Sequence, residues 1–114
     1  MNSKRKRAIN GFLNRRVDIE RPVQVSDGGG GFTETWQIFA TVWAGFEVLR
    51  GSESFSDLRV QGTSNHRITV RYTKGVEPKM RVVFNHRIFN IRAVINIDEA
   101  NEILELMCEE GVAV

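Results

Sequence analysis

The glycine run is the first stretch whose residue types could bind a small ligand. It lies within SDGGGGFTETW, residues 26–36. A phosphate-binding loop needs spaced glycines whose N–H groups converge, followed by a helix N-terminus. Here the glycines are contiguous, no Lys-Ser or Lys-Thr pair follows, and the next residues favour a strand. We therefore expect Gly28, Gly29, Gly30 and Gly31 to form a hairpin tip, where glycine adopts positive φ at low steric cost.

The histidines and the cysteine are too few for a recognisable catalytic or metal site. The chain has His66, His86 and Cys108 and no others of either type. A catalytic zinc ion usually takes three protein ligands, and the spacing of these three residues is not diagnostic. Alternation places Cys108 on the side of Leu104 and Leu106, so we expect a small core residue rather than an exposed nucleophile. We predict no enzymatic activity, no cofactor and no metal.

Arginines on predicted strand faces indicate a second class of function. Arg67 and Arg71 share the outer face of one strand, and Arg92 lies on the outer face of another. Such a face can follow a nucleic-acid backbone without reading its sequence. Most aromatic side chains fall at inward positions, with Trp43 and Phe39 as exceptions, which disfavours base stacking. A nonspecific nucleic-acid interface and an ordinary solvated sheet face both remain open.

Period-two alternation along most of the chain predicts strands rather than helices. We expect an all-β fold, a small barrel or sandwich of about six to seven short, mostly antiparallel strands. The first strand is expected to end at Pro22, and Gly45 to mark a bulge or bend. Asn85 and His86 are expected to form a turn, and residues 98–101 another. The predicted strands are 17–21, 33–40 and 41–49 (two strands or one bent strand), 66–72, 80–84, 87–97 and 102–109, with inward positions in the second region at Trp36, Ile38, Val42, Ala44, Phe46 and Val48.

The length of 114 residues predicts one domain, 1–114. Within it we expect a basic N-terminal arm (1–16), a β-barrel (17–111) and a long connection at 50–65, either a loop or a short helix capped by Ser52 or Ser54. No apolar run approaches a membrane span, and no secretory signal is recognised. Residues 1–21 carry a net charge of +5 and residues 98–114 a net charge of −6. Such a chain can bind a copy of itself head to tail.

The order of segments resembles the head–tail joining, or head-closure, family of tailed bacteriophages and prophages. The similarity runs from about Val17 to Gly111, and order and spacing carry it rather than any single motif. A Gly-rich tip and an aromatic strand are followed by a strand, a turn, a short strand and an acidic C-terminal strand. The best matching segments are TVWA (41–44), HRITVRY (66–72), MRV (80–82), FNI (89–91), DE (98–99) and LELMCEE (104–110).

The resemblance implies a structural protein of the virion neck, assembled in the host bacterial cytoplasm. In that family a ring of small β-barrels sits below the portal and its adaptor, retains packaged DNA and offers a docking surface for the tail, without catalysis. The implied partners are other copies of the chain, portal and adaptor proteins, tail terminator or tail proteins, and double-stranded DNA in the channel, but no membrane. The alternative function is that of a small β-barrel that binds nucleic acid nonspecifically.

Three groups of residues are then candidates for assembly contacts. The long connection is expected to face the channel or a partner, the glycine tip to dock a partner ring, and the charged ends to pair between neighbouring subunits. The channel candidates are Arg50, Glu53, Asp57 and Arg59. The tip candidates are Gly28, Gly29, Gly30 and Gly31, and the inter-subunit charges are Arg15, Arg16, Glu109 and Glu110.

Overall fold

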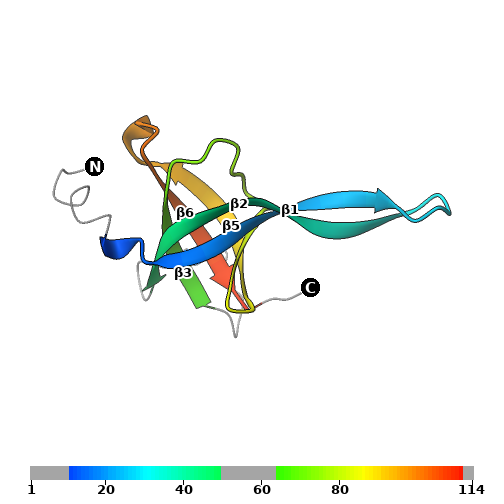
Figure 1. Ribbon diagram of the computed structural model, residues 1–114, viewed down its shortest axis with the longest axis horizontal. Helices are drawn as coiled ribbons and strands as arrows, with labels where there is room; N and C mark the ends of the chain where they lie inside the picture. Colours follow the sequence, from blue (N-terminus) through cyan, green and yellow to red (C-terminus); the bar gives the residue numbers. More distant parts are fainter. Residues whose placement is uncertain (1–10, 50–63, 112–114) are drawn as a thin grey trace.

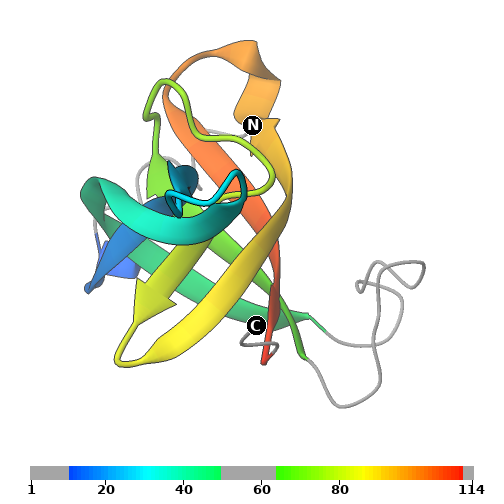
Figure 2. The ribbon, with the colours of Figure 1, turned by 90° about the vertical axis from the view of Figure 1, so that its right-hand side faces the viewer.

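The computed structural model describes residues 11–49 and 64–111, which form a single antiparallel sheet that closes on itself (Figures 1 and 2). The order around the sheet is β1-β2-β3-β6-β5-β4. Closure is uneven, because β1 meets β4 only over Asp18–Glu20. This confirms the predicted all-β fold. The strands are β1 (Arg15–Ser26), β2 (Phe32–Leu49), β3 (Ser64–Arg71), β4 (Arg81–Phe84), β5 (Arg87–Asn96) and β6 (Ile103–Glu110), with a 3-10 turn at Ile97–Glu99 before β6.

The interior of the closed sheet is filled by alternate side chains from all six strands. Phe89 is the largest fully buried side chain, and its ring packs edge-on against Phe46 and His66, with centroids 5.1 and 5.0 Å away. Cys108 is fully buried in the same core, which confirms its predicted structural role. The buried core comprises Val17, Ile19, Ala44, Ile68, Val70, Val76, Met80, Val82, Phe89, Ile91, Leu104, Leu106 and Cys108.

The hairpin formed by β1 and β2 extends far beyond the barrel (Figure 1). Its outer part, residues 21–37, is called the arm below; its strand residues pair only with each other, because β2 pairs with β3 no earlier than Ala44. The arm makes the molecule elongated, 55 Å long against 30 and 26 Å across. The predicted strand end at Pro22 is wrong, since β1 continues to Ser26. Proline is tolerated because one edge of β1 is open there.

A bulge at Phe39 reverses the predicted facing of the arm. Ile19 pairs with Ala40 but Glu20 pairs with Ile38, so Phe39 is the extra residue, and it packs against the core. Ile38 therefore points outward and is 61% exposed. Inward facing was predicted correctly for Val42, Ala44 and Phe46, which lie in or against the core. The same prediction was wrong for Trp36, which lies on the arm, and for the exposed Ile38 and Val48. Phe39 was expected to face outward, and that prediction was also wrong.

Gly45 lies in a stretch of regular strand pairing, so the predicted bulge or bend there is wrong. A glycine is needed at this position for another reason. It pairs with Thr69, and a Cβ atom at Gly45 would collide with the ring of Phe12. Phe12 and Leu13 belong to a second apolar cluster with Ile97 and Ile103. Thr69 alternates with the inward-facing Ile68 and Val70 yet is fully buried. Residues 11–13 thus cover part of the outer surface of the sheet.

The predicted turns are confirmed. Asn85 and His86 link β4 to β5 as a two-residue hairpin turn with positive φ at both positions, 51° and 65°. Before β6, Asn96 and Asn101 are joined by side-chain hydrogen bonds, Nδ2 of Asn96 donating to Oδ1 of Asn101 over 2.8 Å. The strand prediction for the last apolar run is also confirmed. Although Glu, Leu and Met favour helices, β6 pairs with β3 on one side and β5 on the other.

Candidate assembly surfaces

The glycine tip is a compact turn closed by Asp27. The backbone N–H groups of Gly29 and Gly31 donate to Oδ1 of Asp27 over 2.8 and 3.1 Å, and Gly28 and Gly30 have φ of +82° and +91°. This confirms the hairpin-tip interpretation. These N–H groups are directed at a carboxylate of the chain itself, so the tip is not preorganised to hold a phosphate. Its role as a docking surface for a partner ring stays a prediction.

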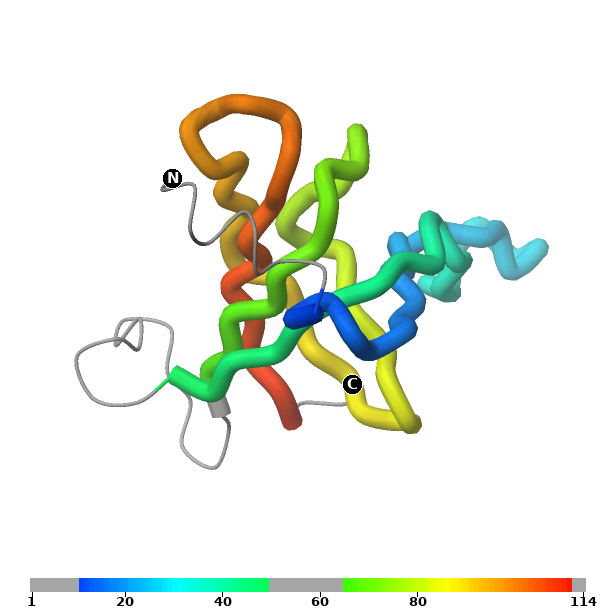
Figure 3. Tube along the Cα trace, turned by 60° about the vertical axis from the view of Figure 1, so that its left-hand side comes forward, coloured from blue at the N-terminus to red at the C-terminus, as the bar shows by residue number. Residues whose placement is uncertain are grey.

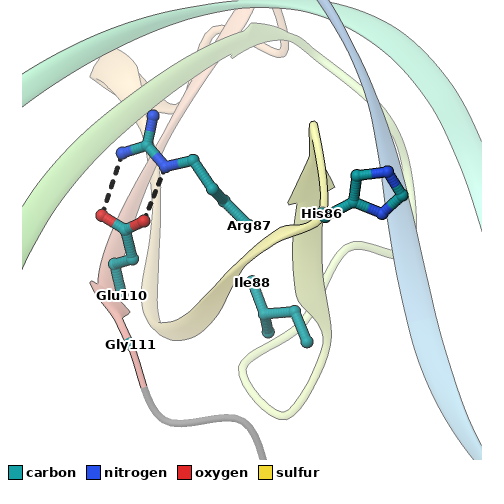
Figure 4. Close-up of a pocket in the computed structure, with 5 residues that line it drawn as sticks. All are labelled: His86, Arg87, Ile88, Glu110 and Gly111. Atoms are coloured by element: carbon teal, nitrogen blue, oxygen red, sulfur yellow. Dashed lines mark hydrogen bonds and ion pairs between the residues drawn. The ribbon is translucent and has the colours of Figure 1, made fainter.

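The carboxylate of Glu110 is matched within the chain by Arg87. The guanidinium donates from Nε to Oε2 over 2.6 Å and from Nη2 to Oε1 over 2.9 Å (Figure 4). This hydrogen-bonded pairing lowers the pKa of Glu110 and raises the pKa of Arg87. His66 Nε2 lies 3.8 Å from Oε1 of Glu110. A contact between Glu110 and a neighbouring subunit would have to compete with this bidentate pair.

Glu109 is also paired within the chain. Its side chain is 1% exposed, and Nε of Arg92 donates to its Oε1 over 2.8 Å. Moving Arg92 away would leave a buried carboxylate without its cation, which is energetically costly, so this cost keeps Arg92 next to Glu109. An inter-subunit role for Glu109 stays a prediction and would require an exchange of partner arginines. Both carboxylates lie at the end of β6 and both partners lie on β5.

Arg15 and Arg16, the predicted basic partners, lie over aromatic rings at the start of β1. The Cζ atom of Arg15 is 5.3 Å from the ring centre of Phe46, and that of Arg16 is 5.3 Å from the ring centre of Trp43. Both arginines are exposed. The rings orient the guanidinium groups without neutralising them, so these two charges are available to another molecule.

The sheet-face arginines that suggested a nucleic-acid interface are largely neutralised. Arg67 lies 3.4 Å from Glu47 and 3.8 Å from Glu105, and Arg92 bonds Glu109. Arg71, at the end of β3, is exposed. The three arginines therefore do not form a continuous cationic track, which is what a phosphate backbone would require.

The four channel candidates lie outside the described residues. They are Arg50, Glu53, Asp57 and Arg59.

The structure also contains a small pocket of about 220 Å³ near the ion pair of Arg87 and Glu110. It is lined by His86, Arg87, Ile88, Glu110 and Gly111, and Figure 4 shows His86 pointing away from the ion pair. Within residues 11–49 and 64–111 no group of three metal-ligating side chains gathers. In the same residues no helix is long and apolar enough to cross a membrane.

Sequence reasoning missed two of the exposed apolar residues of β2. Phe32 and Ile38 are 67% and 61% exposed, whereas Trp43, which is 50% exposed, was expected to face outward. Alternation did identify a strand here, but it could not reveal the bulge at Phe39 or show that a third of the strand, residues 32–37, lies beyond the barrel. The glycine run could have indicated the arm, because a glycine-rich turn between two β-rich segments is typical of a long hairpin.

The comparisons with known proteins identify the family of the chain. The family described as phage head completion protein matches residues 10–111. A chain of the virion of a native gene transfer agent particle is 32% identical, with a TM-score of 0.66 over 89% of this chain and 97% of that one. Protein SF1141 from Shigella flexneri 2a, known from a solution structure, is 29% identical, with a TM-score of 0.71 over 91% and 97%. The search of curated proteins found no match. The chain belongs to the phage head completion protein family and is a structural protein of the phage head–tail region.

Proposed function

We propose that this protein closes the DNA-filled phage head at its neck. Copies of the chain form a ring below the portal, retain the packaged DNA and present a surface on which the tail docks. The observation that carries the proposal is the family match over residues 10–111, which includes the whole described barrel and the arm. The similarity to a virion chain at 32% identity adds that a related barrel occurs within an assembled particle.

The charge distribution supports an assembly protein over a free nucleic-acid binder. Arg67, Arg81, Arg87 and Arg92 each bond or approach a carboxylate of the same chain. Ion pairs of this kind take these four arginines of the sheet out of any phosphate-binding surface. The proposed partners are therefore other copies, portal or adaptor proteins and tail proteins. DNA would be contacted only inside the assembled channel, by the segment that contains Arg50, Glu53, Asp57 and Arg59.

The test is electron microscopy of lysates from a phage or induced prophage that lacks this gene. We expect heads without tails that are empty or lose their DNA after packaging, with recovery on complementation by the wild-type gene. Intact tailed particles with full heads would contradict the proposal. In that case salt-dependent binding of the purified protein to double-stranded DNA becomes the decisive measurement.

The channel role of the 50–65 connection can be tested separately. A variant with Arg50→Ala and Arg59→Ala should still enter particles if the barrel alone mediates assembly. We expect such particles to retain less DNA than wild-type particles, measured as nuclease-accessible DNA per head. Equal DNA retention would remove these two arginines from the gate while leaving the neck assignment intact.

A further inference from the structure

One face of the arm carries large apolar side chains on either side of Glu34. Strand pairing joins Ser26 to Phe32, Pro22 to Trp36 and Glu20 to Ile38, which places the side chains of Phe32, Trp36 and Ile38 on the same side of the hairpin. We call this surface the arm face; Ile38 lies at the base of the arm, one residue beyond it. Phe32 and Ile38 are among the most exposed large apolar residues of the described chain, at 67% and 61%. With Trp43 on the adjoining barrel wall, the exposed apolar area is on the order of 400 Å², the size of the largest patch on a typical monomer, which is often functional.

Trp36 is held in position by charged neighbours from the barrel. The Cζ atom of Arg81 lies 4.0 Å from its ring centre, and Nε of Arg81 donates to Oε1 of Glu20 over 2.8 Å. Arg81 is only 16% exposed as a side chain. An aromatic ring fixed in this way loses little conformational entropy when another surface covers it. The arm face therefore has the rigidity of a contact surface rather than that of a mobile tip.

The two edges of the arm are open as well. Between Arg21 and Gln37 neither strand pairs with β3 or β4. An isolated two-stranded hairpin is marginally stable in water, and open edges are usually protected by charge or by a neighbouring element. The arm has few charges to protect it, namely Arg21, Asp27 and Glu34. A covering surface from another molecule would stabilise it.

A second copy of the chain offers a surface of suitable size and charge. The molecule is 55 Å long and 30 and 26 Å across, so its length exceeds its width by about the width of one barrel. The arm has a net charge of −1, from Asp27 and Glu34 against Arg21, whereas residues 71–80 carry Arg71, Lys74 and Lys79 against Glu77, all exposed. Tyr72 in this segment is 37% exposed. Figures 1 and 3 show the segment that follows β3 on the side of the barrel from which the arm extends, short of the tip, and a Cβ atom at Gly75 would meet the ring of Phe39 at the base of the arm.

We propose that the arm of each copy lies across the barrel of the next copy, with the arm face against the segment 71–80. This contact is heterologous, because it joins two different patches and so propagates around a ring. It rests on the proposed function, in which the chain assembles as a ring, and it names the surfaces that form the ring. It differs from pairing between the charged chain ends, because its arm side is formed by Phe32, Trp36 and Ile38 with Glu34 among them, and by neither end of the chain.

Disulfide cross-linking in assembled particles tests the contact. Glu34→Cys places a thiol on the arm face and Lys74→Cys places one on the basic segment. Cys108 is fully buried and does not compete. On mild oxidation of particles carrying both substitutions, we expect a ladder of covalently linked copies on a denaturing gel. Particles carrying either substitution alone are the control and should give no ladder, because a heterologous contact does not bring identical positions together.

A second experiment compares matched exposed residues on and off the arm. Phe32→Ser with Ile38→Ser removes the apolar side chains of the arm face. Val48→Ser is the control, since Val48 is 53% exposed on β2 but pairs with His66 of β3 in the barrel, at the end of β2 away from the arm. We expect the arm variant to lower the yield of tailed particles at least tenfold, as a buried interface anchor would, while Val48→Ser leaves the yield within about twofold. Circular dichroism of each purified variant verifies that the barrel is folded.

The outcomes separate this proposal from the proposed function. If the wild-type chain is absent from purified particles, the proposed function fails. If the chain is present but the cysteine pair gives no ladder, or the arm cross-links to a portal or tail protein instead, the neck assignment stands and the second-copy contact is overturned. Equal yields from the arm variant and the Val48→Ser control would also overturn it.

Discussion

Gly45 provides a sharp test of how the outer surface of the barrel is packed. A methyl group at this position would occupy the space of the Phe12 ring, so Gly45→Ala must displace residues 11–13 from the sheet. Leu13, which is 6% exposed, would lose its contacts with Ile103 together with Phe12. Re-exposing one nearly buried and one half-buried side chain costs about 3 kcal/mol. Alanine in a strand offsets about 0.5–1 kcal/mol of this by restricting the unfolded chain.

We therefore expect Gly45→Ala to lower the free energy of unfolding by about 2 kcal/mol. In a protein of this size that corresponds to a fall in Tm of roughly 8 °C. The assay is urea denaturation of the purified chain followed by circular dichroism, with thermal unfolding as a second measurement. A loss of stability in Gly45→Ala could also come from a disturbance elsewhere in the sheet. A control must therefore show that the collision with the Phe12 ring causes it.

A double-mutant cycle supplies that control. Phe12→Ala opens the space that the new methyl group needs. In this background Gly45→Ala should be neutral or stabilising by about 0.5–1 kcal/mol, which gives a coupling free energy of about 2–3 kcal/mol between the two positions. An equal loss in both backgrounds, or no loss in the wild-type background, would refute the packing of residues 11–13 over Gly45.

Three further predictions concern the ion pair, the thiol and one turn. Hydrogen bonding from Arg87 lowers the pKa of Glu110, so its stabilising contribution is complete above the ordinary value of 4.5 and is lost as the pH falls through the lowered value. Urea titrations at pH 6 and about pH 3 should show a smaller loss of stability for Glu110→Gln than for wild type, and equal losses would contradict this. Burial raises the pKa of the Cys108 thiol, so a thiol reagent at pH 8 should modify it only in denaturant, whereas rapid labelling of folded protein would show the core to be open. His86→Gly should raise the free energy of unfolding by up to about 1 kcal/mol, because His86 has φ of 65°; a decrease measured by urea denaturation would show that its side chain contributes more than its strain.

Much of the fold could be predicted because its strands follow local rules. Alternation in HRITVRY sets which side chains fill the core, and a period of two is readable without any tertiary information. In RIFNIRAVINI it holds only as far as Ile91, because a bulge at Arg92 turns Val94 toward the core and leaves Ile95 exposed. The turn at Asn85 and His86 and the Asp-Gly-rich tip have local chemistry that favours reversal of the chain. The absence of a phosphate-loop pattern was equally local, and the closed Asp27 turn agrees with it.

The candidate assembly residues were harder to evaluate from the sequence. Glu109 and Glu110 were recognised as charges at the acidic end, but their pairing with Arg92 and Arg87 depends on β5 lying beside β6. The arginines of the sheet face likewise looked like a cationic surface until the structure placed carboxylates from other strands next to them. Ion pairing between residues far apart in the chain is a property of strand order, which alternation does not encode.

The sequence by itself determined the strand content, the turn positions, the buried thiol and the similarity to a phage family, since each depends on short-range pattern or on segment order. Tertiary structure alone decided three features. It placed the bulge at Phe39, which turns Ile38 outward, and it allowed β1 to run through Pro22 because that edge has no neighbour. It also made Gly45 the site of closest approach for Phe12. All three depend on where strands meet and where pairing stops, which is set by closure of the sheet rather than by any residue's own preference.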